Sequence, residues 1–316
     1  MRYLLAVIAV GALAVCAAPA QNQPCAVAGN DNSFLGIQTI RLWPGDAPGA
    51  KGKACEDTPT LTIVSPRAHA ENGTAVIINP GGSYKILAGD LEGGEIANWF
   101  AARGVRAFVL SYRLTTNGYM MPAPLEDARR AVQFVRAHAA EYKVNPNRIG
   151  LIGFSAGGHL AALAGTRPIA GKADASDPVE RVSSRPDYLV LGYPWLGAIG
   201  MDMLHLNYCK INNVVDQCEA LRAAYSPDLF VSKDTPPVFL YHTFNDKTVP
   251  VEQALTFYNA LVKNGVSAEM HIFANGGHGS GLGKGDAALD QWPALLETWM
   301  REQGLLTVDK EAVGAK

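Results

Sequence analysis

The chain has 316 residues, of which 48% are hydrophobic and 18% are charged, and this balance excludes a disordered or fibrous protein. Its 27 basic and 29 acidic residues give a formal net charge of -2 without long runs of one sign, so we expect no nucleic-acid partner. The length allows one large domain or two small ones.

The first twenty residues, 1–20, have the pattern of an export signal. Arg2 precedes an apolar run over 4–17, and Ala18-Pro19-Ala20 supplies the small residues of a cleavage site. This run is shorter than the roughly 20 residues that a membrane-spanning helix needs, so we expect no stable membrane insertion after cleavage. The sequence predicts a secreted or periplasmic protein whose mature part, 21–316, forms one domain. An uncleaved anchor and a lipoprotein attached through Cys16 are the alternatives.

Short β-branched runs alternate with amphipathic stretches along the rest of the chain. This alternation predicts an α/β fold, with a mainly parallel central sheet and helices on both faces. The expected strands cover 36–43, 61–65, 74–79, 107–112, 149–154, 188–193, 238–242 and 269–273. We expect the first two near an edge of the sheet, and the later apolar runs in buried parallel positions. The expected helices cover 97–102, 124–142 and 251–264.

The longest interval with neither pattern covers residues 196–234. Its apolar residues could form a small cap over a substrate cleft, or a helical excursion packed against the core, and both interpretations stay open. The interval holds Cys209 and Cys218, the first choice for a disulfide in the mature chain. With Cys25 and Cys55 they allow three pairings, and buried free thiols are the alternative. Neither Cys-x-x-Cys nor His-Glu-x-x-His occurs, so we expect no metal and no cofactor.

A nucleophile elbow is predicted where an apolar strand meets a helix. Gly153-Phe154-Ser155-Ala156-Gly157 follows the expected strand 149–154 and precedes a helix-like stretch. The turn between the two is sharp, so glycines are needed two residues before and two after the serine. At the helix N-terminus, backbone N–H groups would face developing negative charge. The pattern therefore predicts Ser155 as a nucleophile.

A serine hydroxyl needs a base to remove its proton, and the base needs an acid to orient it. In folds with this elbow the chain order is serine, acid, histidine, with the partners on loops that follow later strands. His278, in a glycine-rich loop after the strand 269–273, fits the base, and Asp246, after the strand 238–242, fits the acid. The alternatives are that His278 only caps a loop and that Asp246 only forms a local turn.

Acyl transfer also needs N–H donors for the oxyanion of a tetrahedral intermediate. Ala156, directly after the serine, would supply one. The turn Pro80-Gly81-Gly82-Ser83, after the strand 74–79, would supply another from Gly82 or Ser83. A plain Pro-Gly-Gly turn is the alternative interpretation.

These motifs resemble those of secreted α/β-hydrolase esterases, the acetylxylan esterases and related hemicellulose deacetylases. The matching stretches include Leu42-Trp43-Pro44-Gly45, Pro80-Gly81-Gly82, Ser111-Tyr112-Arg113-Leu114, residues 150–158, Pro236-Pro237-Val238-Phe239-Leu240 and Gly277-His278-Gly279. The resemblance implies that Ser155, Asp246 and His278 are catalytic, with Gly82, Ser83 and Ala156 around the oxyanion. Ser83 departs from the third glycine that relatives often have, and a positive φ would strain a serine there.

The resemblance implies hydrolysis of short-chain esters, acetyl esters above all, through an acyl-enzyme and without a cofactor. The substrate would be a small-molecule or polysaccharide ester such as acetylated xylan, although fold and triad do not fix the substrate. Three alternatives stay open: a lipase-like esterase for longer acyl chains, a peptidase of the prolyl-oligopeptidase kind, and a non-catalytic binding protein with a hydrolase fold. No oligomeric state is predicted.

Overall fold

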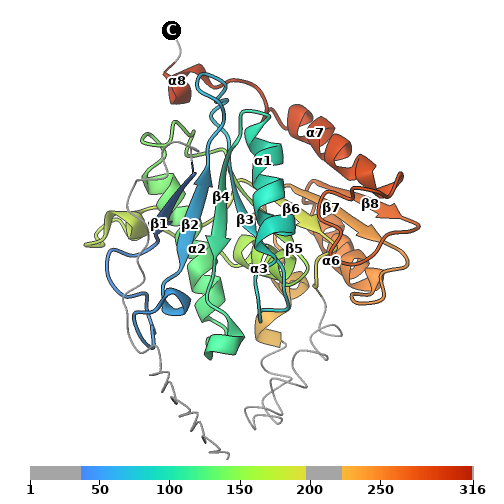
Figure 1. Cartoon of the computed structure of the whole chain (residues 1–316), viewed down its shortest axis with the longest axis horizontal. Helices are drawn as coiled ribbons and strands as arrows, with labels where there is room; N and C mark the ends of the chain where they lie inside the picture. Colours follow the sequence, from blue (N-terminus) through green and yellow to red (C-terminus); the bar gives the residue numbers. More distant parts are fainter. Residues whose placement is uncertain (1–36, 197–222, 315–316) are drawn as a thin grey trace, which may run out of the picture.

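A computed structural model describes residues 37–196 and 223–314, which form an eight-stranded sheet between two layers of helices (Figure 1). The strands are β1 (Ile37–Arg41), β2 (Thr60–Val64), β3 (Ala75–Asn79), β4 (Arg106–Ser111), β5 (Ile149–Phe154), β6 (Tyr188–Gly192), β7 (Val238–Thr243) and β8 (Ala268–Phe273). Each lies where the sequence predicts a strand. Their order across the sheet is β1-β2-β4-β3-β5-β6-β7-β8.

Most neighbouring strands run parallel. In this sheet only the pairs β1–β2 and β2–β4 are antiparallel, and they lie at one end of the strand order. Every residue of β3, β5 and β6 is buried, which explains why these strands are continuous apolar runs in the sequence. Because parallel strands all end at the same edge, the loops after β3, β5, β7 and β8 meet at the carboxyl edge of the sheet. The predicted α/β fold is confirmed.

Helices cover both faces of the sheet (Figure 1). On one face pack α2 (Ala123–Ala137), α3 (Ala156–Thr166) and α6 (Val251–Lys263). The other face carries α1 (Glu95–Ala101) and α7 (Trp292–Glu302), and the short α8 (Lys310–Val313) follows. Helix α2 ends at Ala137, five residues before the predicted end at Tyr142. The prediction ran too far because Ala139 and Tyr142, which lie in the turns after the helix, keep the apolar spacing and pack in the core. The sequence analysis did not predict α7, although its buried residues show the helical spacing.

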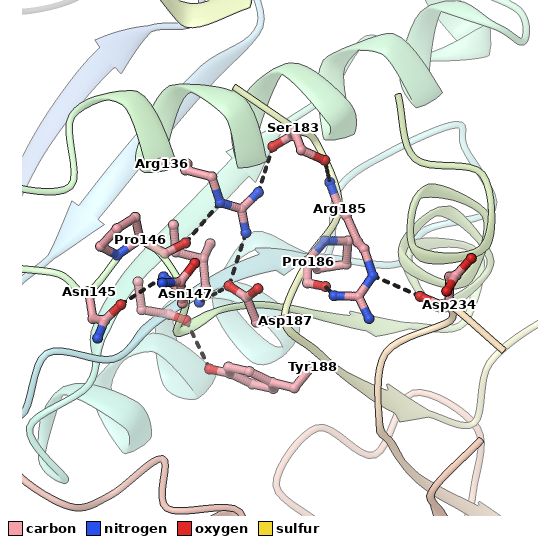
Figure 2. Close-up of polar contacts among 12 residues, drawn as sticks. Arg136, Asn145, Pro146, Asn147, Ser183, Arg185, Pro186, Asp187, Tyr188 and Asp234 are labelled. Carbon is pink, nitrogen blue, oxygen red and sulfur yellow. Dashed lines mark hydrogen bonds and ion pairs between the residues drawn. The ribbon is translucent and has the colours of Figure 1, made fainter. Parts of the chain in front are cut away.

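At the amino edge of the sheet, one arginine ties several loops together (Figure 2). Arg136 donates from Nε to the carbonyl of Pro146 (2.8 Å), from Nη1 to that of Ser183 (2.5 Å) and from Nη2 to Asp187 Oδ2 (2.9 Å). The same carboxylate oxygen accepts the N–H of Ile149 at 2.9 Å. Burial raises the pKa of Asp187 despite these partners. The network fixes the starts of β5 and β6.

Several predictions fall on residues outside the described part of the chain. These are the signal peptide over 1–20, the pair Cys209 and Cys218, and the cap between 197 and 222. Of the predicted cap, the described end includes the short 3-10 helix η7 (Pro227–Phe230). Within 37–196 and 223–314, no helix combines the length and apolarity that crossing a membrane requires.

Candidate active site

Ser155 occupies a sharp turn between β5 and α3. Its backbone has φ 50 and ψ -120, a conformation that non-glycine residues rarely adopt. A Cβ atom on Gly153 would lie 2.0 Å from the carbonyl oxygen of Gly157. A Cβ atom on Gly157 would lie 2.0 Å from the carbonyl oxygen of Asn79. The close approach of β5, α3 and the end of β3 therefore requires both glycines, and it raises the serine above the sheet.

The three residues that the sequence predicts as a triad are joined by hydrogen bonds. Ser155 Oγ lies 2.8 Å from His278 Nε2, and His278 Nδ1 lies 2.7 Å from Asp246 Oδ2. Asp246 follows β7 and His278 follows β8, so the contacts bridge 123 and 32 residues of sequence. The imidazole is 18% exposed and the carboxylate is fully covered. The base is thus open to substrate while the acid is shielded.

The Asp246 carboxylate is suited to stay ionised. Burial favours its neutral form, but hydrogen bonds from His278 and from the N–H groups of Val249 and Thr248 outweigh that effect and hold the pKa of Asp246 below its usual value. Both backbone bonds end on Oδ1, at 2.9 and 2.8 Å. Oδ2 is therefore free to accept the imidazole N–H, which fixes the tautomer in which Nε2 faces the serine.

The turn after β3 lies against the serine. A Cβ atom on Gly81 would lie 3.0 Å from Ser155 Cβ, which leaves no room for a side chain. Gly82 and Ser83 have φ values of 126 and 58, so Ser83 does take the positive φ that the sequence analysis identified as a source of strain. Between described residues, neither N–H takes part in a hydrogen bond.

Ala156 begins α3, so its N–H has no carbonyl partner within the helix. Together with the two N–H groups of the turn after β3, it offers donors for a substrate oxygen. The structure thus brings the predicted oxyanion residues beside the predicted triad. Their catalytic roles remain predictions.

Two residues that contact the site escaped the sequence analysis. Glu92, which is 3% exposed, accepts hydrogen bonds from the N–H of Gly81 and from the hydroxyl of Tyr193, both at 2.7 Å. The ring of Tyr193 meets that of His278 edge to face, with centroids 5.0 Å apart. The only local signal was that Tyr193 ends an expected strand. Nothing near Glu92 in the sequence distinguishes it from a surface acid.

The other described histidines do not contact the serine hydroxyl. His159, one turn along α3, is buried and bonded to the hydroxyl of Tyr84 and the carbonyl of Tyr225, both at 2.7 Å. Its packing role agrees with the sequence analysis. In the described ranges, no group of three or more His, Cys, Asp or Glu side chains could hold a metal ion.

A hydroxyl, an imidazole and a carboxylate in one hydrogen-bonded line, beside a turn rich in free N–H groups, define the class of serine hydrolases. Known proteins with similar sequences agree with this class. The BD-FAE family model matches residues 61–187, and the prolyl oligopeptidase family model matches residues 200–304. The chain belongs to the α/β-hydrolase superfamily.

Similar solved structures include esterases and related hydrolases. An acetyl ester-xyloside bifunctional hydrolase from Caldicellulosiruptor lactoaceticus is 36% identical, with a TM-score of 0.74 over 85% of this chain and 97% of its own. An esterase from Thermogutta terrifontis with bound propionate is 25% identical, with a TM-score of 0.70 over 87% and 97%. Among sequences, an acetylxylan esterase from Xylanibacter ruminicola is 30% identical over 73% of this chain and 46% of its own. The chain thus spans less than half of that curated relative.

Proposed function

We propose that this protein is a serine carboxylesterase that hydrolyses short-chain esters through an acyl-enzyme. The observation that carries the proposal is the continuous line from Ser155 Oγ through His278 to Asp246, with distances of 2.8 and 2.7 Å. Such a line lets the imidazole take the hydroxyl proton while the carboxylate stabilises the imidazolium.

In the first half of the reaction the serine takes the acyl group. Ser155 Oγ attacks the ester carbonyl, and its proton moves to His278 Nε2. The carbonyl oxygen becomes an oxyanion, and the N–H groups of Ala156 and of Gly82 or Ser83 stabilise it. The carbon–alkoxy bond then breaks, and the imidazolium gives its proton to the leaving alcohol.

In the second half, water replaces the alcohol. His278 takes a proton from the water, whose oxygen attacks the acyl carbon in the same oxyanion site. Collapse of the second tetrahedral intermediate breaks the bond to Ser155 Oγ, which regains its proton from the imidazolium. The products are a carboxylic acid and the free enzyme, so no cofactor is consumed.

We propose acetyl groups on a hemicellulose such as xylan as the natural substrate. Support comes from the relatives: one is named an acetylxylan esterase, another an acetyl ester-xyloside hydrolase, and a third, from Butyrivibrio fibrisolvens, an endo-1,4-beta-xylanase. The third is 32% identical over 65% of this chain and 32% of its own.

The test is acetate release from acetylated xylan, measured beside a series of aryl esters from acetyl to long acyl chains, with wild-type protein and Ser155→Ala. We expect acetate release by the wild type alone and rates that fall as the acyl chain lengthens. Wild-type inactivity on every ester would overturn the proposal, and activity on aryl esters without xylan deacetylation would refute only the substrate.

A specific observation favours an esterase for longer acyl chains as a second candidate. Ile86 is 64% exposed and Leu91 is 40% exposed. A Cβ atom on Gly82 would meet Ile86, and one on Gly281 would meet Leu91, so both apolar residues lie near the turn and the histidine loop. A steady rise in rate with acyl length would support this candidate.

The match to the prolyl oligopeptidase family favours a peptidase as a third candidate, because it spans both Asp246 and His278. Peptidases and esterases share this triad, so the same assay should include proline-containing peptide amides. Cleavage of esters but not of amides would support the esterase.

We further propose that residues 1–20 are a cleaved export signal and that the mature protein is secreted or periplasmic. Support comes from the apolar leader and from Cys55, which is disulfide-bonded, as expected in an oxidising compartment. The pair Cys209 and Cys218 remains a proposal. Mass spectrometry of the exported protein, with and without reduction, would test the cleavage site and the pairing.

A further inference from the structure

A buried carboxylate lies behind the candidate oxyanion turn and takes no part in the triad. Glu92 belongs to the π-helical turn η3 (Gly89–Gly94) that leads from the loop after β3 into α1. Each of its two oxygens accepts a hydrogen bond, one from Gly81 and one from Tyr193. The ionised carboxylate, with acceptors on both oxygens and no donor, matches these two donors.

The first bond holds the oxyanion turn. A Cβ atom on Gly81 would lie 2.6 Å from Glu92 Oε2 and 3.0 Å from Ser155 Cβ, so Gly81 is packed between the carboxylate and the serine. On the preceding residue, the Tyr112 hydroxyl donates to the carbonyl of Pro80 at 2.7 Å. The peptide group between Pro80 and Gly81, just before the proposed N–H donors, is thus held on both sides.

The second bond reaches the histidine loop. The hydroxyl of Tyr193 donates to Glu92 Oε1 and accepts the N–H of Gly281 at 3.1 Å. Gly281 lies three residues after His278, whose ring packs on that of Tyr193. One carboxylate therefore links the turn that would bind the oxyanion to the loop that carries the base.

The charges around Glu92 are few. Burial raises the pKa of Glu92 above its usual value. The hydrogen bonds from Tyr193 and Gly81 and the positive charge of His278 offset part of this rise. The other titratable groups that face it are the hydroxyls of Tyr112 and Tyr241, whose pKa values burial raises first and the charge on Glu92 raises further. Of these partners, His278 is the one that belongs to the candidate triad.

We propose that Glu92 is a positioning residue that, as a carboxylate, holds the oxyanion turn through Gly81 and the histidine loop through Tyr193. This inference rests on the proposed ester hydrolysis. Among the described residues, no hydrogen bond joins Glu92 to Ser155 Oγ, so its effect is on the placement of the groups that would react.

Glu92→Gln tests the inference, because the amide has one acceptor and one donor where two acceptors are needed. We expect kcat for an aryl acetate to fall on the order of 10- to 100-fold, as for a small misplacement of catalytic groups, while KM changes less than about threefold. Because the change removes a negative charge that interacts with the positive charge of His278, the acid limb of kcat/KM should move to lower pH. Glu95→Gln is the matched control, since Glu95 is 40% exposed and pairs only with Lys284 at the surface.

Tyr193→Phe tests the second link and keeps the ring against His278. Losing the hydroxyl removes a hydrogen bond that lowers the pKa of Glu92. The change also removes the link from Glu92 to the N–H of Gly281, so kcat should fall about tenfold. Because the carboxylate itself is kept, the acid limb should move less than in Glu92→Gln. Tyr188→Phe is the control, because this equally buried hydroxyl donates to the carbonyl of Ala75 at the amino edge (2.9 Å).

A lowered kcat in both variants, with the acid limb displaced in Glu92→Gln, would support the inference. A wild-type kcat in Glu92→Gln, or a lowered kcat with the limb unmoved in both variants, would overturn it. If Glu92→Gln does not fold, the kcat of Tyr193→Phe beside that of Tyr188→Phe decides alone. Ser155→Ala in the same assay separates the two proposals. Undiminished activity of Ser155→Ala would refute the proposed esterase mechanism. If Ser155→Ala is inactive and Glu92→Gln has the kcat of wild type, only the proposed role of Glu92 is refuted.

Discussion

The two edges of the sheet use the same device for different ends. At the amino edge, Asp187 accepts a backbone N–H and pairs with Arg136. At the carboxyl edge, Asp246 accepts two backbone N–H groups and pairs with His278. Burial raises the pKa of Asp187, whereas at Asp246 the hydrogen bonds outweigh burial and lower the pKa. The guanidinium is permanently charged and does not exchange a proton with its partners, while the imidazole can exchange a proton with Ser155.

The edges also differ in backbone strain. Six described non-glycine residues have positive φ, and four of them lie at the carboxyl edge, namely Ser83, Tyr84, Ser155 and Tyr193. Such conformations persist only where surrounding contacts enforce them, and they cluster at functional sites. A carboxylate at a strand end is therefore not itself a sign of chemistry. What distinguishes the site is a titratable partner together with a strained serine whose hydroxyl it contacts.

Replacing the nucleophile should have the largest effect. Ser155→Ala should lower kcat for aryl acetates by roughly 10⁴- to 10⁶-fold, because triad members act as a unit. Hydrolysis measured at saturating substrate checks this. Ser184→Ala is the control, since this buried hydroxyl accepts the N–H of Ile169 away from the triad. Activity within tenfold of wild type in Ser155→Ala would mean that another group attacks the ester.

The two aspartates should respond differently to the same change. Asp246→Asn should lower kcat by about 10⁴-fold, since the amide can favour the wrong tautomer of His278. Asp187→Asn should leave kcat within about threefold, because its partner is an arginine remote from the serine. Comparable losses in the two variants would erase the proposed contrast between the edges.

Breaking the amino-edge network should cost stability rather than activity. Arg136→Met removes three donors and leaves Asp187 without its cation, which we expect to lower the free energy of unfolding by about 2 to 4 kcal/mol. Urea denaturation followed by circular dichroism measures this change. At a temperature where the variant is folded, kcat should equal that of wild type. A folded variant with a large loss of kcat would show that the two edges are coupled.

The smallest expected effect concerns the strained turn. Ser83→Gly should raise the free energy of unfolding by up to about 1 kcal/mol, because glycine adopts positive φ without a steric cost. Activity should stay within about threefold if only the N–H group of this residue is used. Thermal denaturation and aryl acetate hydrolysis of the same preparation check both expectations, and a destabilised variant would mean that the serine side chain has a role of its own.

The sequence by itself determined the strands, their mainly parallel arrangement, and the positions of Ser155, Asp246 and His278. Each of these follows from a local pattern: an apolar run, a glycine-flanked turn, or a polar residue directly after a strand. Chain order then singled out one histidine and one aspartate, because the carboxyl ends of parallel strands meet at one edge.

Only the tertiary structure decided what surrounds the triad. The contacts of Glu92 with Gly81 and Tyr193 span 11 and 101 residues, and the contact of Tyr193 with Gly281 spans 88. Partners this far apart leave no periodic mark on the sequence, because each residue alone looks like an ordinary acid, aromatic or glycine. The positive φ of Ser83 was likewise decided by packing around the turn rather than by the residue itself.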